Sequence, residues 1–563
     1  MVRVKKLPYG ISDYESLIEN DYYYVDKTMY IEKLENLAER YIMFLRPRKF
    51  GKTLFTSTLE NYYDIKKEEK FEKLYGETYI GKNPTKLKNS YHILKFNFSG
   101  IDTANRETTI KGFKREVSSS IRFFVEKYKL DFYINEESEA EDILDNLIKA
   151  FEIQKQNGKI YVIIDEYDHF ANELLGFNTN QFKNLVSKNG KVRKWYEILK
   201  EGTESVVDRI FITGVAPITL DSLTSGFNIS SDKTQNGFFN EMIGFTQEEL
   251  IKLMEDFDIE GQEQDRLLPI MKDNYDGYKF SLDGKENVYN SNMCLFFFNA
   301  YLENRKIPRN LMDMNIASDY SKLSNMLNLC RGEEKTNIIE KTIVGEGIIT
   351  KITQQFNPAI EFTEQELISM LFYLGYLTIV AEKADYPVLK VPNKAMKEIY
   401  SDYFLKTLDT SIHNLNELYS SIALEIRLEG KINKLIELAQ KYLSNLSNRD
   451  YIKFDEKYIK FLLYCILMNL DNFMVKSEME FNKRYPDLLI LPIDFSKGYK
   501  SIMIELKYLK KDEENKLEEK QKEAKKQIQE YMQLDDTKKI PDLKCYTIVA
   551  VNDRLHVEEV EIR

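Results

Sequence analysis

Four short apolar segments in the first half of the chain constrain its fold most strongly. They are rich in β-branched and aromatic residues, and enough chain for a helix separates each from the next: YIMFL (41–45), HILKFNF (92–98), IYVIID (160–165) and RIFITG (209–214). Strands of a parallel sheet are buried on both faces, so they read as continuous apolar runs instead of alternating ones. The pattern predicts a parallel α/β sheet in this half.

The apolar pattern changes twice further along the 563-residue chain. After about residue 290 it is mainly helical, with a hairpin at 376–392 that suggests a winged-helix-like region. The last part reads as a helical lead-in to a self-contained α/β unit, with a helix (456–470), three strands, a charged helix (513–532) and a closing strand (545–551). We expect an α/β protein with three regions, 1–290, 291–410 and 411–563.

Composition excludes several classes of protein. Lys and Arg number 80 against 91 Asp and Glu, a net charge of −11, so contact with nucleic acid must come from local patches. The four cysteines lie far apart and form no CxxC pair, which argues against a zinc ribbon or disulfide framework and fits a reducing compartment. The longest apolar stretches, 370–381 and 461–470, are shorter than the roughly 18–20 residues of a membrane span. No apolar segment follows the basic N-terminus, so we expect a cytoplasmic protein without membrane contact.

The first candidate site is a phosphate-binding loop. Gly51, Lys52 and Thr53 follow the apolar segment 41–45 and precede a helical pattern. A glycine lets backbone N–H groups approach phosphate oxygens, a lysine neutralises phosphate charge, and a threonine hydroxyl binds Mg²⁺. The standard GxxxxGK[ST] loop has glycine where this chain has Arg46, and a lone GKT in a surface turn would carry little weight.

Two later strand ends strengthen the loop assignment. IYVIID ends in Asp165, followed by Glu166, which would place one carboxylate near Mg²⁺ and the next beside an attacking water. RIFITG contains Thr213, which could sense the γ-phosphate. Strands capped by solvent-facing polar residues are the alternative, but the three elements in this order favour ATP–Mg²⁺ binding. We expect the strand of Asp165 to lie directly beside the strand that leads into Gly51, with both carboxyl ends at one crevice.

The second candidate site is a pair of carboxylates with a lysine near the C-terminus. Asp487 opens an apolar strand, and Glu505 and Lys507 lie two residues apart in IMIELKYL, so both point to one face. Two acids that hold Mg²⁺ and a lysine that stabilises charge suit phosphodiester hydrolysis. An edge strand with alternating charges is the alternative. The apolar residues around them would make unpartnered charges costly, which favours a site.

Blocks along most of the chain resemble one family, prokaryotic proteins with an AAA-like (ASCE) P-loop ATPase domain followed by a PD-(D/E)XK nuclease domain. The blocks are YVDKTMYIEKL (24–34), RPRKFGKTL (46–54), IIDEYD (163–168), ITGVAPITLDSLTSGFNI (212–229), NYDGYKF (274–280), and GYLTI with KVPNKAM (375–396). The loop form RPR-x-FGK[ST] is usual in that family, so Arg46 is in keeping with it. RYPDLLILP matches the Asp motif, although Pro486 and the lack of a glycine before Arg484 depart from its commonest form.

The resemblance implies roles for individual residues of the ATPase domain. Its nucleotide and Mg²⁺ site would consist of Lys52, Thr53, Asp165 and Glu166. Arg46 and Arg48 would be either further phosphate contacts or fold-stabilising ion-pair partners. TSGFN (224–228) would be a switch or contact loop.

The resemblance also implies roles in the nuclease domain. Asp487 and Glu505 would hold Mg²⁺ beside Lys507, and Gln527 would join the edge of the site, with Tyr531 packed nearby. Further candidates for a metal ligand are Glu456 and Glu480, although a plain helix N-terminal role is favoured for Glu456.

Other conspicuous residues have structural interpretations. The four histidines, His92, His169, His413 and His556, show no metal-ligand spacing, and only His169 lies close enough to Asp165 in sequence to touch a site. Trp195 is expected in the core. Arg193 and Arg209 are candidates for an arginine finger.

Together these features predict an ATPase that regulates a Mg²⁺-dependent nuclease acting on DNA or RNA. The resemblance suggests mobile-element biology or phage defence, and it leaves a homo-oligomer open. The rival hypothesis is a nucleotide-dependent regulatory or scaffold protein whose nuclease-like domain binds nucleic acid or protein without cleavage. An intact set of Asp487, Glu505 and Lys507 favours the enzyme.

Overall fold

The computed structural model describes residues 5–169, 190–217, 229–313, 332–354, 363–408, 414–445, 455–477 and 486–561, with the short pieces 323–324, 326–327 and 356. The chain divides into two compact units. The first consists of Met1–Ile307, Ser321–Arg331 and Ile348–Pro392, and the second of Pro308–Tyr320, Gly332–Gly347 and Asn393–Arg563. The three-region division with boundaries at 290 and 410 stays a prediction. Several residues discussed above lie outside the described ranges: TSGFN (224–228), His413, Glu480 and Arg484.

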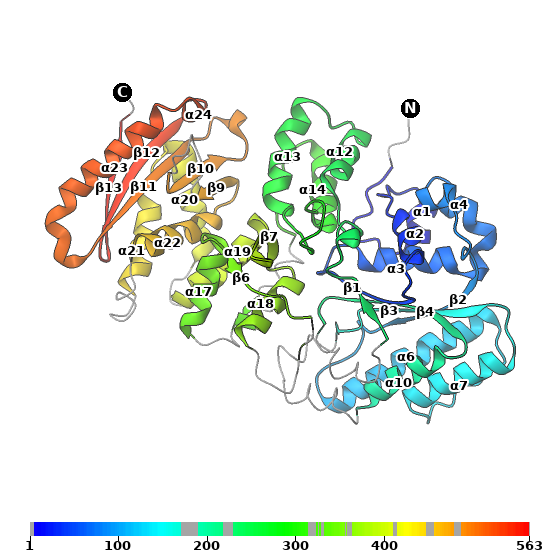
Figure 1. Cartoon of the computed structure of the whole chain (residues 1–563). Coiled ribbons are helices and arrows are strands. Elements are labelled where there is room, and N and C mark those ends of the chain that lie inside the picture. Colours follow the sequence, from blue (N-terminus) through cyan, green and yellow to red (C-terminus); the bar gives the residue numbers. More distant parts are fainter. Residues whose placement is uncertain are drawn as a thin grey trace. The chain divides into compact units, whose positions relative to one another are not determined.

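A five-stranded parallel sheet forms the centre of the first unit, as the apolar segments predicted (Figure 1). Its strands, in spatial order, are β2 (Tyr91–Asn97), β3 (Lys159–Asp165), β4 (Val207–Gly214), β1 (Tyr41–Leu45) and β5 (Ser231–Asp232). Every neighbouring pair is parallel. The first four strands coincide with the predicted segments, whereas β5 is too short to leave a pattern.

The prediction that the strand of Asp165 lies directly beside the strand leading into Gly51 is wrong. β4 lies between β3 and β1 and pairs with both. The order of strands in a sheet depends on where each crossover connection returns, which local sequence does not specify. Because the three strands are parallel, their carboxyl ends still meet at one edge, and the crevice expected there is retained.

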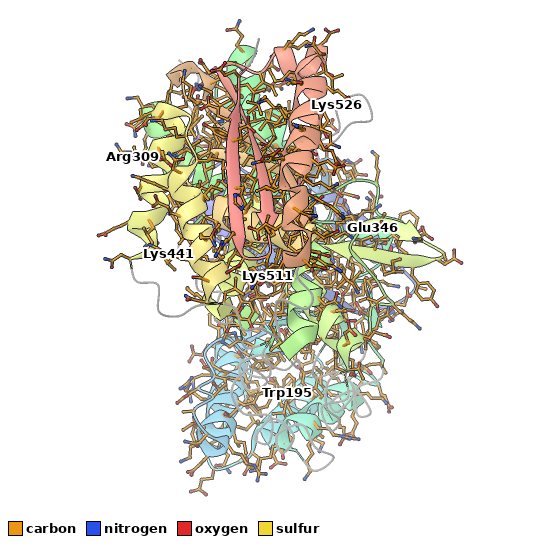
Figure 2. The ribbon with its side chains drawn as sticks, turned by 90° about the vertical axis from the view of Figure 1, so that its left-hand side faces the viewer. Trp195, Arg309, Glu346, Lys441, Lys511 and Lys526 are labelled. Carbon is orange, nitrogen blue, oxygen red and sulfur yellow. The ribbon has the colours of Figure 1, made fainter. Side chains whose placement is uncertain are left out.

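Helices cover both faces of this sheet (Figure 1). On one side lie α1 (Tyr14–Glu19), α2 (Met29–Glu35), α3 (Lys52–Tyr63) and α4 (Phe71–Tyr75), with the short α5 (Tyr79–Lys82) against α2 and α4. On the other lie α6 (Arg106–Tyr128), α7 (Ala140–Ile153) and α10 (Lys191–Gly202). Trp195 of α10, labelled in Figure 2, is completely buried against Phe96, Phe98 and Phe113, which confirms it as a core residue.

The middle of the chain is mainly helical, as predicted. Its helices are α12 (Gln247–Asp256), α13 (Gln262–Tyr275), α14 (Ser291–Asn304), α17 (Gly332–Ile343), α18 (Glu364–Tyr373), α19 (Lys394–Leu408), α20 (Leu415–Glu429) and α21 (Asn433–Ser444). A small antiparallel sheet has the order β6 (Ile348–Ile349), β8 (Tyr386–Lys390), β7 (Thr378–Lys383). β7 and β8 form the hairpin expected at 376–392.

A second five-stranded sheet belongs to the second unit. Its order is β13 (Arg554–Val560), β12 (Leu543–Val551), β11 (Ser501–Leu509), β10 (Leu488–Pro492), β9 (Phe473–Ser477), with β11 and β12 parallel and the other pairs antiparallel. α22 (Glu456–Met468) precedes β9, α23 (Leu517–Met532) packs on β11 and β12, and α24 (Asp535–Lys538) follows. Ile528 and Tyr531 of α23 share a buried cluster with Met503.

Strand β13 was missed in the sequence, because its polar residues alternate at an edge of the sheet and give no apolar run. None of the helices in the described part of the chain is long and apolar enough to cross a membrane.

Candidate functional sites

The loop between β1 and α3 has the backbone shape of an anion-binding turn. Lys49 and Gly51 have positive φ angles of 68° and 106°, and Gly51 is the N-cap of α3. The helix therefore begins at Lys52, and its first N–H groups have no intrahelical acceptor. Glycine suits this position, because an L side chain rarely adopts such a φ.

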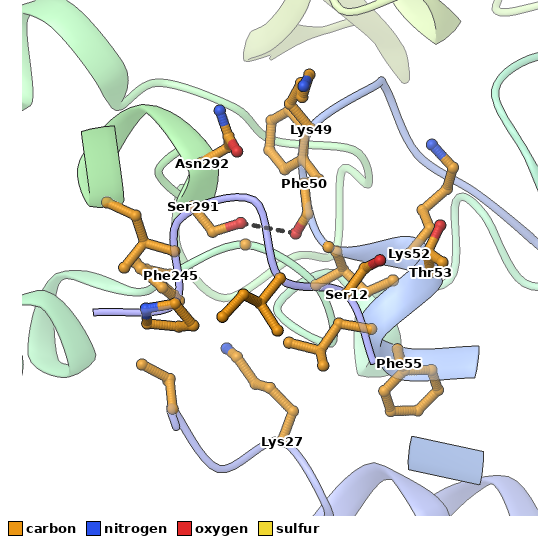
Figure 3. A pocket seen from close by; sticks show the side chains of 18 of the residues that line it. Ser12, Lys27, Lys49, Phe50, Lys52, Thr53, Phe55, Phe245, Ser291 and Asn292 are labelled. Carbon is orange, nitrogen blue, oxygen red and sulfur yellow. Dashed lines mark hydrogen bonds between the residues drawn. The ribbon is translucent and has the colours of Figure 1, made fainter. Parts of the chain in front are cut away.

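A cavity of about 400 Å³ opens beside this turn (Figure 3). Its walls come from the loop 48–55, the N-terminal residues 8 and 10–12, the segment 242–245, and Ser291 and Asn292 at the start of α14. The hydroxyl of Ser291 donates to the carbonyl oxygen of Phe50 at 2.9 Å, the dashed line in Figure 3. A partly apolar cavity that is open on one side and adjoins a phosphate-binding turn suits a nucleotide base and its phosphates.

The ammonium group of Lys52 lies between the turn and the end of β3. Its Nζ donates to the carbonyl oxygen of Pro47 at 3.2 Å and lies 3.8 Å from Glu166 Oε1. Asp165 is completely buried; its Oδ1 accepts the N–H of Glu166 at 3.0 Å, and its Oδ2 has no hydrogen-bond partner among the described residues. Burial and then Glu166 raise the pKa of Asp165, whereas Lys52 and the Thr53 hydroxyl oppose the rise. A buried acidic oxygen without a partner, beside a lysine and a threonine, fits Mg²⁺ bound to phosphate.

Arg46 is fully buried and does not line the cavity. Its guanidinium lies between two aromatic rings, 4.1 Å from the centroid of Phe44 and 4.2 Å from that of Phe280. It donates to the carbonyl oxygens of Thr234 and Phe239 at 2.9 and 3.0 Å. Burial lowers the pKa of Arg46 to about 9. Of the two roles that the sequence left open, these contacts support fold stabilisation, through carbonyl oxygens and rings instead of the ion pair expected.

Arg48, in contrast, lines the cavity, and its Nη2 lies 3.5 Å from Nδ1 of His169. The two arginine-finger candidates do not line it. Arg193 donates from Nε to Glu197 Oε1 at 3.0 Å, one turn along α10. Arg209 lies near the amino end of β4. Because β3 and β4 are parallel, Arg209 is at the opposite end of the strands from the carboxyl end of β3.

Thr213 is not brought to the cavity either. It is fully buried, and its hydroxyl donates to the carbonyl oxygen of Phe44 at 2.8 Å. Its assignment to nucleotide sensing stays a prediction.

Asp168 was not selected from the sequence, yet its carboxylate accepts the N–H groups of Val215 and Ala216 at 3.0 and 2.7 Å. A second aspartate three residues after Asp165 was the available signal, and its role is to hold the segment that follows β4.

At the second site, Asp487 directly precedes β10 and Glu505 lies in the middle of β11. Leu488 is paired with Ile504, so continuing this antiparallel register by one residue sets Asp487 opposite Glu505. Asp487 Oδ2 accepts the N–H of Leu506 at 2.8 Å. Lys507 Nζ donates to Glu505 Oε1 at 2.7 Å. The structure therefore brings together the three residues that the sequence selected here.

Glu505 carries the strongest sign of a cation site. It is 3% exposed, and no group in the described part of the chain is hydrogen-bonded to its Oε2. Burial, then Asp487, raise the pKa of Glu505 to about 7; Lys507 opposes this rise and Glu456 adds to it. A buried carboxylate beside other acids fits Mg²⁺, which binds through one or two carboxylates plus water and substrate oxygens. Within the described ranges no three His, Cys, Asp or Glu side chains converge as a complete ligand set.

Two residues of α22 border this site. Glu456 is half-buried at the start of the helix; burial raises its pKa, Lys507 lowers it and Asp487 raises it. Lys460 Nζ lies 3.5 Å from Asp487 Oδ1. Lys460 could not be selected from the sequence, because one lysine in a helical pattern is expected on the solvent side.

Gln527 lies half-buried on α23, and its Oε1 is buried without a hydrogen-bond partner. Its place at the edge of the site stays a prediction.

Comparisons with known proteins agree with the two sites. Residues 8–224 match a family model described as "Predicted AAA-ATPase", and residues 454–559 match one described as "PD-(D/E)XK nuclease superfamily". The chain therefore carries an AAA-ATPase-like domain followed by a PD-(D/E)XK nuclease domain, which confirms the resemblance found in the sequence blocks.

Two individual proteins are similar to this chain. An "Uncharacterized protein in vnfD 5'region" from Azotobacter chroococcum mcd 1 is 24% identical over 395 residues, which are 67% of this chain and 64% of that protein. The chain thus spans less than two thirds of this relative. Among solved structures, Cdc6p from Pyrobaculum aerophilum matches 72% of this chain and 97% of its own, with 12% identity and a TM-score of 0.26.

Proposed function

We propose that this chain binds and hydrolyses ATP in its first domain and cleaves nucleic-acid phosphodiesters in its second, and that the state of the ATP site controls cleavage. We place this activity in the cytoplasm, on DNA or RNA. The observation that carries the nuclease assignment is Glu505, a buried carboxylate with one oxygen unpartnered, opposite Asp487 and hydrogen-bonded to Lys507.

The ATP proposal rests on the turn and the cavity beside it. The phosphates would lie along the N-terminus of α3, with Lys52 neutralising their charge. Thr53 and Asp165 would hold Mg²⁺, and Glu166 would orient the attacking water. The base would occupy the part of the cavity lined by Ile11 and Phe245.

In the nuclease site, Asp487 and Glu505 would hold Mg²⁺. When bound, this ion polarises the scissile phosphate and makes a bound water more acidic. The N–H of Leu506 keeps the Asp487 carboxylate turned toward the site. The ammonium of Lys507, held by Glu505, would stabilise negative charge on the phosphate or orient the water.

Panels of labelled DNA and RNA, incubated with Mg²⁺ with and without ATP, test the proposal and identify the substrate. Lys507→Ala should lower the cleavage rate about a hundredfold or more. Lys511→Ala, a matched change at an exposed lysine labelled in Figure 2, should leave the rate within about twofold. Equal loss in both variants would contradict the role of Lys507. Binding without cleavage by the unchanged chain would favour the scaffold alternative.

A further inference from the structure

Lys460 is a buried lysine whose ammonium faces the candidate nuclease site. It lies on α22, between Ile459 and Phe461, both fully buried, and is 7% exposed. Its Nζ lies 3.5 Å from Asp487 Oδ1. Burial of an ammonium group is unfavourable unless a counter-charge compensates it. A lysine on the solvent-facing side of a helix needs no such counter-charge. The burial of Lys460 therefore indicates a specific role for its ammonium group.

Asp487 is held on both of its oxygens. Oδ2 accepts the N–H of Leu506 at 2.8 Å, and Oδ1 faces Lys460. Glu505 is held on one oxygen, by Lys507 at 2.7 Å, and its buried Oε2 has no hydrogen-bond partner within the ranges that the structure describes. Each of the two acids therefore has its own lysine, and one acceptor remains for a further cation.

A charge count separates a site for one divalent ion from a site for two. Asp487, Glu505 and the nearby Glu456 supply three negative charges, and Lys507 and Lys460 supply two positive charges. Lys520, which also lies near Glu456, is compensated by Glu523 at 2.6 Å and adds no net charge. One divalent ion would leave a single positive charge, which one phosphodiester neutralises. Two divalent ions would leave three positive charges, of which one phosphodiester neutralises one. The two that remain would be uncompensated at a largely buried site, which low dielectric strongly disfavours.

We infer that Lys460 is a positioning residue whose fixed positive charge takes the place of a second divalent cation. The Asp487–Glu505 site therefore binds one divalent ion. The inference rests on the proposed nuclease function. Lys460 acts through Asp487, whose carboxylate it orients and whose charge it partly neutralises.

Titration of the nucleotide-free full chain with Mn²⁺ tests this inference without nucleic acid. Calorimetry gives the number of ions and their affinity, and electron paramagnetic resonance detects a spin-coupled pair. The number of ions bound at this site is the number that the unchanged chain binds minus the number that Asp487→Asn binds. The unchanged chain should bind one such ion. Lys460→Met, which keeps the stem and removes the charge, should bind the first ion about tenfold more tightly and accept a second.

Two further variants complete the experiment. Lys460→Arg retains the charge and should restore one ion, and Lys457→Met, at an exposed position on the same helix, should match the unchanged chain. Two ions in the unchanged chain would overturn the inference even if Lys460→Met failed to fold. A folded Lys460→Met with unaltered count and affinity would also overturn it. Mn²⁺ binding that Asp487→Asn leaves intact would instead overturn the nuclease proposal itself.

Discussion

Glu505 combines burial, negative neighbours and an unpartnered oxygen in one side chain. Such a carboxylate destabilises the metal-free protein when it is ionised and binds a cation strongly when one is available. The same features that fit Glu505 to Mg²⁺ therefore give the metal-free protein a distinctive response to pH.

The stability of the metal-free protein should fall as pH rises from about 5 to 8. The pKa of Glu505 is about 7 in the folded chain against an ordinary 4.5, so the folded state binds more protons between these values. Stability present below pH 4.5 is thus lost as pH rises through 7, by on the order of 1–3 kcal/mol from this group. Urea denaturation at both pH values should show that Glu505→Gln removes most of this loss. Glu519→Gln, at an exposed position on α23, is the control; an unaltered pH dependence in Glu505→Gln would contradict the assignment.

Arg46 should contribute more to the stability of the fold than to ATP binding. Arg46→Met removes several hydrogen bonds to buried carbonyl oxygens, which should cost about 2–4 kcal/mol in urea denaturation. Arg40→Met, at an arginine that is 59% exposed in its ion pair with Asp208, should cost less than about 1 kcal/mol. In calorimetry, folded Arg46→Met should retain ATP binding, whereas Lys52→Ala should lose it. Loss of ATP affinity in a folded Arg46→Met equal to that in Lys52→Ala would argue for a phosphate contact.

At the scale of elements, α14 holds the phosphate-binding turn from 241 residues away in the chain. The hydroxyl of Ser291 donates to the carbonyl oxygen of Phe50 at 2.9 Å, and the N–H of Asn292 donates to that of Lys49 at 3.3 Å. These bonds fix the carbonyl groups of the turn, so that its N–H groups stay directed at the phosphate position.

Ser291→Ala should therefore weaken ATP binding without abolishing it. Loss of one buried hydrogen bond costs about 1 kcal/mol, which corresponds to a roughly threefold to tenfold lower affinity. Calorimetric titration measures this effect. Asn299→Ala, at an exposed position on the same helix, is the matched control and should leave the affinity unchanged. Equal affinities in both variants would remove α14 from the nucleotide site.

The elements that carry a local pattern could be predicted from the sequence. The strands before Gly51 and through Asp165 are apolar runs, and the pair Glu505 and Lys507 follows from a period of two. Strand order could not be predicted, because the position of β4 between β3 and β1 depends on the path of the crossover connections, which local sequence does not specify. The roles of Arg46 and Lys460 were hidden for a related reason, since their partners lie far away in the chain.

At the scale of the whole molecule, each site belongs to its own unit. The cavity beside Lys52 is built within the first unit, and Asp487, Glu505 and Lys507 lie in the second. Separate units predict that a change at one site leaves ligand binding at the other intact. Lys52→Ala should thus retain Mn²⁺ binding at Asp487, measured by calorimetry, and Asp487→Asn should retain ATP affinity. Loss of Mn²⁺ binding in Lys52→Ala would contradict this independence.

Parallel rates of nucleic-acid cleavage and ATP hydrolysis test whether Asp487 serves a nuclease site that the ATP site controls. The unchanged chain, Asp487→Asn and Lys52→Ala are compared at several ATP concentrations with Mg²⁺ present. Asp487→Asn should lose about a hundredfold or more in cleavage and keep ATP hydrolysis, because the acid serves only the second site. Lys52→Ala should lose ATP hydrolysis and no longer change its cleavage rate with ATP. Full cleavage by Asp487→Asn would contradict the assignment of the nuclease site to Asp487, Glu505 and Lys507.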